Sequence, residues 1–309
     1  MLKKFIHHSF WIKVSLFGLY FLASVAITYL YISNEQTFYF WDRSVYHQWT
    51  IEIAQAFLDS PYLALQFIQN TLVSDYNRLY TIPLIPWVLI GGGSRFNYIL
   101  GIVLVYQVPF CFILGKTAQV LLNKDTPFVF WSTSLIALIN PSLWIPTLRG
   151  YPDIGGALFI SLFILVYLKN IYLQNPIKNF LMGVLLTLSV LFRRHFAYSA
   201  LAIFISLCLY SLILCKISRL HSRKFIFYSL TRYFLGVLGV LISSVLSFLL
   251  ISYELLIYFL QKNHSNLYSS YSLPITNIFE FYISFMVDSF WLWQYWGLPQ
   301  VFCLKNIKN

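Results

Sequence analysis

Charged residues are scarce in this sequence of 309 residues, and acidic residues are the scarcest of them. There are 10 Asp and Glu against 21 Lys and Arg; charged residues make up 10% of the chain, whereas hydrophobic residues make up 59%. Soluble domains average about 25% charged and about 45–50% apolar residues. The composition therefore excludes a soluble globular protein. It also excludes a disordered one, because disorder requires many solvated polar residues.

Cysteine is rare, and the sequence signatures of common cofactor sites are lacking. The four cysteines lie in apolar stretches without the close spacing of zinc ligands or redox pairs, so we interpret them as small apolar residues. There is no glycine loop of the kind that binds a nucleotide phosphate, no HExxH and no GxSxG sequence. The histidines are scattered along the chain, so the sequence predicts no metal site.

Long apolar runs occupy most of the remaining sequence. A membrane-spanning helix needs about 20 predominantly apolar residues, and about eight such stretches can be placed, at residues 10–32, 96–121, 127–147, 154–170, 177–192, 196–215, 225–252 and 278–303. The first stretch is too long for the apolar part of a cleaved signal peptide, so we expect it to be retained. The predicted fold class is all-α, a polytopic membrane protein with about eight transmembrane helices.

The basic residues are spread between the apolar runs and form no dense patch, which argues against nucleic-acid binding. With the N-terminus in the cytoplasm, 14 of the 21 Lys and Arg fall on the cytoplasmic side and 7 outside, in agreement with the positive-inside rule. Nearly all acidic residues then lie at the outer face. The predicted location is the plasma (inner) membrane, with several spans and the active face outside.

The longest stretch between predicted spans is the outer loop of residues 33–95. From Gln48 to Ser60 apolar residues recur at helical spacing, which predicts an amphipathic helix in the plane of the lipid headgroups. Ser60 and Pro61 then supply an N-cap and a first-turn proline for a second helix. Together with a short apolar piece at about residues 84–90, these two helices are predicted to lie parallel to the membrane surface. Transporters also carry such juxtamembrane helices, so this feature alone does not separate an enzyme from a transporter.

Asp42 precedes these juxtamembrane helices in the chain, in the sequence FYFWDRSVYHQW of residues 38–49. Aromatic neighbours such as Tyr46 exclude water from the surroundings of a carboxylate, which favours a general base at the membrane surface. The alternative is a solvated loop acid that is paired with the adjacent Arg43.

Two further groups of charged residues lie at the outer ends of predicted spans, where an uncompensated charge is costly. Arg149 and Asp153 stand four residues apart around a turn, and the alternative to a functional role is a salt bridge that closes the helical hairpin. Arg193 and Arg194 precede His195 and oppose the positive-inside trend. The planar guanidinium suits phosphate oxygens, whereas the alternative is anchoring to lipid headgroups without chemistry.

In their order along the chain, these parts resemble the GT-C fold glycosyltransferases that use polyprenyl-phosphate sugars, in particular the protein O-mannosyltransferases and the lipid A aminoarabinose transferase. Asp42 matches the early acid of that family, and Arg43 stands where the family often has a second acid. Arg95 matches the arginine that opens the family's second helix, after the proline-containing sequence YTIPLIPWVLIGGG. Residues 137–168 and 180–197 are similar to the family's next hairpin and to the glycine-bearing helix that follows it.

The resemblance covers about residues 10–215. It implies a single GT-C-like transmembrane domain over residues 1–309, with residues 33–95 as the outer loop and the C-terminal part of the family missing. It also implies an inverting transfer of a sugar from a polyprenyl-phosphate donor, with Asp42 as the general base. The other site residues that it implies are donor-phosphate ligands (Arg193, Arg194 and Arg149) and supporting residues (Asp153, Arg95, Arg43, Tyr46 and His195).

The partners that the resemblance implies are membrane lipid, the polyprenyl-phosphate sugar and an acceptor that is a glycan, a lipid or a protein, with no nucleic acid. No cofactor is indicated with certainty. Some members of the family use a divalent metal ion, and Arg43 in the place of a second acid does not favour such an ion here.

Two other functions stay open. A multi-pass transporter or flippase would share the helices and the basic outer residues, although such proteins commonly have two related halves and charges within the membrane. The sequence shows no clear repeat of one half in the other, and its charges gather at the outer edge. The second alternative is an inactive, truncated glycosyltransferase-like membrane protein, which would keep the motifs without the activity.

Overall fold

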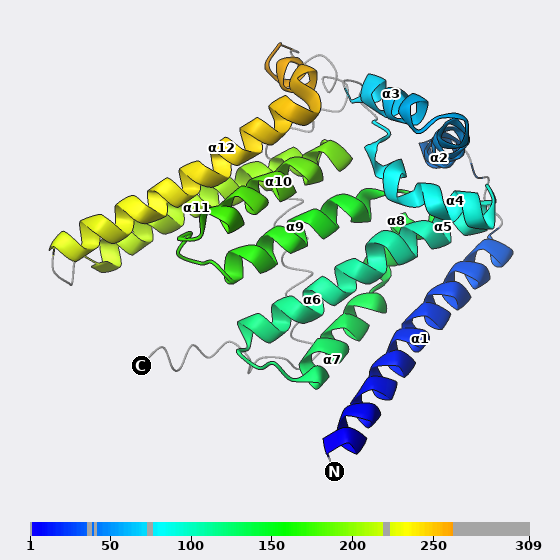
Figure 1. Cartoon of the computed structure of the whole chain (residues 1–309), viewed down its shortest axis with the longest axis horizontal. Helices are drawn as coiled ribbons and strands as arrows, with labels where there is room; N and C mark the ends of the chain where they lie inside the picture. Colours follow the sequence, from blue (N-terminus) through cyan, green and yellow to red (C-terminus); the bar gives the residue numbers. More distant parts are fainter. Residues whose placement is uncertain (1, 36–38, 40–41, 73–76, 219–222, 262–309) are drawn as a thin grey trace, which may run out of the picture. The chain divides into compact units, whose positions relative to one another are not determined.

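The structure, a computed structural model, describes residues 2–35, 39, 42–72, 77–218 and 223–261. Every regular element among these residues is helical, which confirms the all-α prediction for this part of the chain (Figure 1). The chain divides into two compact units, residues 1–259 and 260–309, and all the contacts considered below lie within the first unit.

Short connections join successive helices. The N-terminal part consists of a long helix followed by short helical elements: α1 (Leu2–Asn34), α2 (Asp42–Asp59), α3 (Pro61–Thr71), the 3-10 helix η1 (Leu79–Leu84) and α4 (Ile85–Gly91). The following part contains one continuous helix with a π-helical turn, then a broken pair: α5 (Arg95–Ile102), η2 (Val103–Gln107), α6 (Val108–Leu121), α7 (Pro127–Leu138) and α8 (Pro141–Leu148). The last part is made of longer helices: α9 (Asp153–Leu168), α10 (Pro176–Phe192), α11 (Phe196–Ser218) and α12 (Arg223–Gln261).

Three helices among the described residues are long and apolar enough to cross a membrane: Lys13–Asn34 of α1, the continuous Arg95–Leu121, and Thr231–Tyr253 of α12. A fourth span results if α7 and α8, which are bent by 51° at their junction, cross together as one broken helix. With three or four candidate spans, the described residues indicate a helical, multi-pass membrane protein.

The prediction of about eight spans is wrong for the described residues, and helix length is the reason. α9 has 16 residues and α10 has 17, which at 1.5 Å per residue gives about 25 Å, less than the hydrocarbon core of about 30 Å. The apolar part of α11 that the structure describes in full, Phe196–Tyr210, is likewise short. The eighth predicted span, residues 278–303, lies outside the described residues.

The single helix predicted over residues 127–147 is broken between α7 and α8. The side chain of Asn140 accepts a hydrogen bond from the backbone N–H of Ser142 at 3.0 Å, which caps the start of α8. Pro141 takes the first position of α8, where no intrahelical hydrogen bond is lost. The Asn-Pro pair therefore ends one helix and starts the next.

Residues 33–95 contain the expected short helices, but the first of them begins earlier than predicted. α2 starts at Asp42 and not at Gln48, whereas α3 starts at Pro61 as predicted. Asp42 is therefore a helical residue and not part of a loop. The apolar piece predicted at about residues 84–90 corresponds to the end of η1 and to α4.

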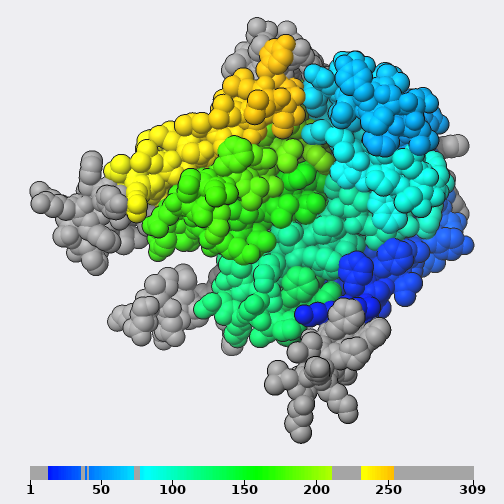
Figure 2. Space-filling view, in the orientation of Figure 1, coloured from blue at the N-terminus to red at the C-terminus, as the bar shows by residue number. Residues whose placement is uncertain are grey.

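The helices α2, α3 and α4 form a small packed layer with its own hydrophobic core. The apolar side of α2 packs against α3 and α4 around Ile53, Ala54 and Ala56, which are buried. The three helices lie together near the end of α1 (Figure 1), and Figure 2 shows their side chains as one continuous surface. The amphipathic pattern of α2 thus stabilises contacts between helices of this layer.

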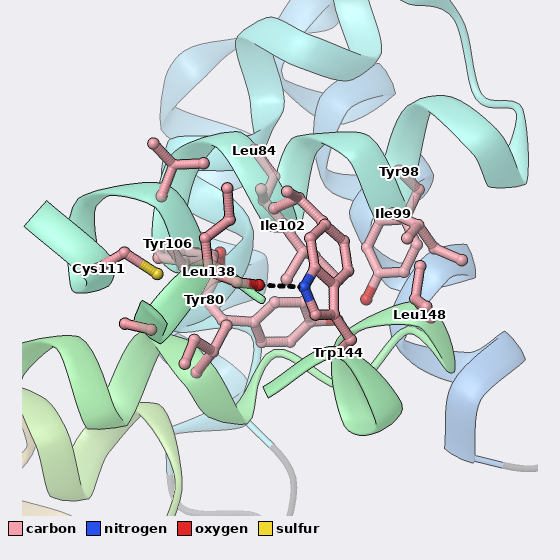
Figure 3. Packing of buried hydrophobic residues seen from close by; sticks show 14 of the residues in the cluster. Tyr80, Leu84, Tyr98, Ile99, Ile102, Tyr106, Cys111, Leu138, Trp144 and Leu148 are labelled. Carbon is pink, nitrogen blue, oxygen red and sulfur yellow. Dashed lines mark hydrogen bonds between the residues drawn. The ribbon is translucent and has the colours of Figure 1, made fainter. Parts of the chain in front are cut away.

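Buried tyrosines fasten this layer to the neighbouring helices. Tyr106 of η2 donates its hydroxyl to the backbone carbonyl of Tyr80, and Tyr80 donates its own hydroxyl to the backbone carbonyl of Tyr46 at 2.7 Å. Figure 3 shows Tyr80 and Tyr106 in the main hydrophobic core, which also contains Ile102 and Leu138. Because a buried hydroxyl needs a hydrogen-bond partner, these bonds fix the position of α2 relative to η1 and η2.

Small residues let α10 and α12 approach each other closely. A side chain at Gly183 would meet the hydroxyl of Ser243 on α12. Thr187 donates its hydroxyl to the backbone carbonyl of Ser244 at 3.0 Å. Small residues and hydroxyl hydrogen bonds are typical of helix contacts in membranes. This interface positions α10, which is followed directly by Arg193.

Candidate functional site

Arg193 lies directly after α10 and contacts side chains from two other helices. Its Nε pairs with Oδ1 of Asp153, the first residue of α9. Its Nη1 donates to the hydroxyl of Tyr46 in α2, and the guanidinium carbon is 5.0 Å from the centre of the Tyr46 ring. The negative charge of Asp42, also in α2, acts on the same guanidinium. We refer to Asp42, Tyr46, Asp153 and Arg193 as the Arg193 cluster.

Helix ends place the charges of the Arg193 cluster. Asp42 and Asp153 stand in the first turns of α2 and α9, where the positive end of the helix dipole favours a carboxylate. Arg193 follows the C-terminal end of α10, where the dipole favours a cation, and its extended backbone directs the chain away from the helix. The turn before α9 uses Gly150, whose φ of +89° lies in the left-handed region that favours glycine. Tyr98 holds this turn by donating to the Gly150 carbonyl at 2.9 Å.

Burial changes the acid-base properties of this cluster. The Arg193 side chain is 18% exposed, and burial lowers its pKa to about 10 while the charge of Asp42 opposes that change. Burial raises the pKa of the Asp153 carboxyl to about 6. Burial and the charge of Arg193 together lower the pKa of the nearby His195 imidazole. At neutral pH Arg193 is therefore charged, Asp153 is mostly ionised and His195 is neutral.

A second buried arginine, Arg95 at the start of α5, has surroundings of the same kind. Its Nη2 pairs with Oε2 of Glu35, whose side chain is 5% exposed. Its guanidinium carbon is 4.0 Å from the centre of the Tyr39 ring. Tyr39 donates its hydroxyl to the backbone carbonyl of Arg43 at 2.8 Å, and Tyr31 donates to Oε1 of Glu35 at 3.0 Å. We refer to Glu35, Tyr39 and Arg95 as the Arg95 cluster.

The structure unites some of the predicted site residues and separates others. Asp153 pairs with Arg193, so the alternative interpretation, a hairpin salt bridge between Arg149 and Asp153, is not what the structure forms. Arg149 is exposed at the end of α8, and the ion pairs found in the described part of the chain do not include it. Arg194 is half-buried beside Arg193. Arg95 belongs to the Arg95 cluster, and Tyr39 of that cluster donates to the backbone carbonyl of Arg43.

Sequence reasoning missed several residues that surround the two clusters. Glu35 belongs to no motif, and only its position directly after an apolar span could have drawn attention to it. Tyr39 lies inside the sequence FYFWDRSVYHQW but has no predicted role there. His47 was also missed: its Nε2 lies 2.9 Å from the carbonyl oxygen of Gly93, and its ring stacks on Tyr98 with 4.8 Å between ring centres. Burial lowers the pKa of the His47 imidazole.

The fold and these clusters define a helical, multi-pass membrane protein in which α2, α9 and α10 bring two carboxylates, a tyrosine and an arginine together. Within the described residues, no group of three or more His, Cys, Asp or Glu side chains is arranged to hold a metal ion. Comparisons with models of protein families, with curated proteins and with solved structures find no match.

Proposed function

We propose that this protein is a membrane glycosyltransferase that transfers a sugar from a polyprenyl-phosphate donor to an acceptor hydroxyl at the outer (periplasmic or lumenal) face. The observation that carries the proposal is that the negative charge of Asp42 acts on the guanidinium of Arg193, although the two residues come from opposite parts of the described chain. A general base and a cation that stabilises phosphate are the two groups that this transfer needs at one place.

In the proposed reaction Asp42 removes the proton of the acceptor hydroxyl while the hydroxyl oxygen attacks the anomeric carbon. The bond between that carbon and the phosphate oxygen breaks on the opposite side, so the configuration is inverted and polyprenyl phosphate leaves with the bonding electrons. Arg193 stabilises the negative charge that develops on the leaving phosphate. Arg194 and the exposed Arg149 are the further cations proposed for the same phosphate.

Neighbouring side chains are proposed to position Arg193 rather than to react. A guanidinium has five N–H donors. Its contacts with Asp153 and Tyr46 involve Nε and Nη1, which leaves further donors for phosphate oxygens. His195 is neutral at this site and adds no competing charge. In this proposal the Arg95 cluster supports the region before α2 and so the position of Asp42.

The proposed orientation places the N-terminus in the cytoplasm of a plasma-membrane protein and the Arg193 cluster outside. Lys3, Lys4 and Lys13 lie at the N-terminal end of the first candidate span, and basic residues at that end support this orientation. A test is a topology reporter inserted after α1, between Asn34 and Asp42. We expect a periplasmic reporter such as alkaline phosphatase to be active there; activity of a cytoplasmic reporter at the same position would overturn the orientation.

The catalytic role is tested by sugar transfer in proteoliposomes that contain the full chain, with tritiated polyprenyl-phosphate mannose and polyprenyl-phosphate aminoarabinose as donors and membrane extract as acceptor. We expect Asp42→Asn to lower transfer by at least about a hundredfold, because a positioned general base contributes about 10²–10⁴-fold. The matched control is Asp125→Asn: this carboxylate is 84% exposed and pairs with Lys116 at 3.0 Å, away from the cluster.

Each outcome separates the possible functions. Undiminished transfer by the Asp42→Asn variant would remove Asp42 from the role of base. Absence of transfer in the unaltered protein with both donors would contradict the proposed function and favour the inactive alternative. Movement of the labelled donor across the bilayer without sugar transfer would favour the flippase.

A further inference from the structure

Gln107 places a polar side chain in the interior of a candidate membrane span. It lies within the continuous helix Arg95–Leu121, and its side chain is completely buried. Within the described residues, neither its Nε2 nor its Oε1 has a hydrogen-bond partner. An amide buried without a partner is costly, and such groups are rare in folded proteins. The Gln107 amide therefore points to a ligand that can both donate and accept hydrogen bonds.

Gln119, further along the same helix, shows how protein groups satisfy a buried amide. Its Nε2 donates to the backbone carbonyl of Thr126 at 2.8 Å, and its Oε1 accepts from Nζ of Lys116 at 2.9 Å. Like Gln107 it is buried. The two glutamines thus share their helix and their burial but differ in their partners, which makes Gln119 the control for the experiments below.

A proline removes one hydrogen bond from the backbone beside Gln107. In the π-helical turn η2 the N–H of Val108 donates to the carbonyl of Val103, five residues earlier. The next donor in that register would be residue 109, which is a proline and has no N–H. The carbonyl of Leu104 therefore receives no hydrogen bond from residue 109. Gln107 follows Leu104 by three residues, within one helical turn.

Buried hydroxyls of α1 lie at the level of this π-helical turn. Two ring contacts join α1 to the continuous helix on either side of η2: Tyr20 with Phe112 at 5.3 Å, and Tyr29 with Phe96 at 6.4 Å between ring centres. Ser24 and Thr28 lie between these two contacts, and α1 packs against η2. Both residues are completely buried, and each donates its hydroxyl to a carbonyl of its own helix at 2.8 Å. The interior at this level is therefore polar.

We propose that Gln107 binds an internal water molecule inside this span. In this assignment the water accepts a hydrogen bond from Nε2 and donates one proton to Oε1 of the same amide. Its second proton goes to the carbonyl of Leu104. Three hydrogen bonds are the usual number for a buried water, about one for each polar group that would otherwise be unsatisfied. Ordered water also satisfies backbone groups that proline frees in membrane helices.

The inference does not depend on the proposed function, because Gln107 belongs to neither arginine cluster. Its direct test is nuclear magnetic resonance of the full chain, labelled with nitrogen-15, in detergent micelles. The Gln107 side-chain signal is the one that disappears in Gln107→Leu. We expect its NH2 group to show dipolar cross-peaks to water of opposite sign in laboratory-frame and rotating-frame spectra, as a long-lived internal water does. The Gln119 amide should show no such pair of cross-peaks.

Melting temperatures give a second test. Gln107→Leu leaves the water and the Leu104 carbonyl without a partner, so we expect the melting temperature to fall by about 2–4 °C. Pro109→Ala supplies the missing N–H, and Gln107→Leu should therefore cost clearly less in that background. Gln119→Leu removes two hydrogen bonds to protein groups, and its cost should be the same in both backgrounds.

Three results would overturn the assignment. One is the absence of the water cross-peaks from the Gln107 signal. Another is a higher melting temperature in Gln107→Leu, which would mean that the amide is buried dry. The third is an equal cost of Gln107→Leu with and without Pro109→Ala, which would exclude the Leu104 carbonyl from the site. If Gln107→Leu does not fold, Gln107→Met identifies the signal, and missing cross-peaks would still end the proposal.

Discussion

Arg95 and Arg193 have matching surroundings: each is largely buried, each pairs with a carboxylate, and each guanidinium lies over a tyrosine ring, at 4.0 Å and 5.0 Å. The difference lies in their acids. Glu35 beside Arg95 is 5% exposed and also accepts a hydrogen bond from Tyr31. Asp153, the acid that pairs with Arg193, is 31% exposed. The negative charge of Asp42 also acts on Arg193.

The contrast teaches that a buried ion pair does not by itself identify a functional arginine. The Arg95 cluster is a closed pair that joins the end of α1 to the start of α5. The Arg193 cluster is more open and has one more negative charge than positive charge among its named members, before Arg194 is counted. We therefore expect changes at Arg95 to act on stability and changes at Arg193 to act on chemistry.

The largest effect on stability is expected from Arg95→Gln. This change leaves the Glu35 carboxylate buried without its cation, and breaking a buried ion pair in this way costs about 3–5 kcal/mol. The measurement is the free energy of unfolding of the purified protein in detergent. Arg149→Gln is the control, since an exposed arginine without an ion pair should change that free energy by less than about 0.5 kcal/mol. Equal free energies of unfolding for the two variants would contradict the stabilising role of the Arg95–Glu35 pair.

The next effect is a pH dependence that belongs to Asp153. Burial raises the pKa of this carboxyl from 3.8 to about 6, so the folded protein binds the proton more tightly than the unfolded chain. Its contribution to the free energy of unfolding is fully present below about pH 4 and is lost as the pH rises through about 6, with a size of at most about 3 kcal/mol.

Asp153→Asn removes this titration, so the difference in unfolding free energy between the unaltered protein and the variant should fall between pH 4 and pH 7. Unfolding curves at pH steps across that interval measure the difference. A difference that rises with pH would show that the pairing with Arg193 outweighs burial. A difference that stays constant would show that Asp153 is not the source of a pH dependence in this interval.

A smaller effect, on transfer activity, is expected from Arg193→Lys. Lysine keeps the charge but loses the planar set of donors that reaches Asp153, Tyr46 and a phosphate together. We expect sugar transfer to fall about tenfold to a hundredfold. Arg95→Lys should lower it much less, because Arg95 lies in the other cluster. Transfer rates in proteoliposomes decide, and a greater loss in Arg95→Lys would reverse the roles of the two clusters.

The smallest effect is expected from Tyr39→Phe. The change removes one hydrogen bond, from the Tyr39 hydroxyl to the backbone carbonyl of Arg43, and should cost about 1 kcal/mol of stability. Tyr46→Phe is the partner experiment, since the Tyr46 hydroxyl accepts from Arg193 and its loss should reduce transfer as well. Transfer and unfolding are measured on both variants. A loss of transfer in Tyr39→Phe alone would contradict the assignment of transfer to the Arg193 cluster and of stability to the Arg95 cluster.

Much of the helical architecture could be predicted from apolar runs and from caps. The start of α3 at Pro61 follows from the Ser-Pro pair, and the break before Pro141 could have been predicted by the same rule. The early start of α2 was missed because aromatic residues around Asp42 hide the helical pattern. Helix length is where the sequence prediction fails most: α9 and α10 are predominantly apolar, but their 16 and 17 residues do not reach the length of a full span.

The candidate site was predictable in its residues but not in its pairings. Arg193 and Asp153 stand out in the sequence because charges are rare at the ends of apolar runs, and Asp42 stands out because aromatic residues surround it. Which acid meets which arginine depends on the packing of α2, α9 and α10, and local sequence does not report contacts between distant helices. For the same reason the sequence leaves open a salt bridge between Arg149 and Asp153 that the structure does not form, and it gives no sign of the partnership of Glu35 with Arg95.

The most direct measurement of the central claim is a double-mutant cycle on sugar transfer, with Asp42→Asn, Arg193→Lys and the combined variant in proteoliposomes. If the carboxylate and the guanidinium act on one reacting phosphosugar, the combined variant should lose clearly less activity than the product of the two single losses. Losses that simply multiply would assign the two residues to independent sites and contradict the claim.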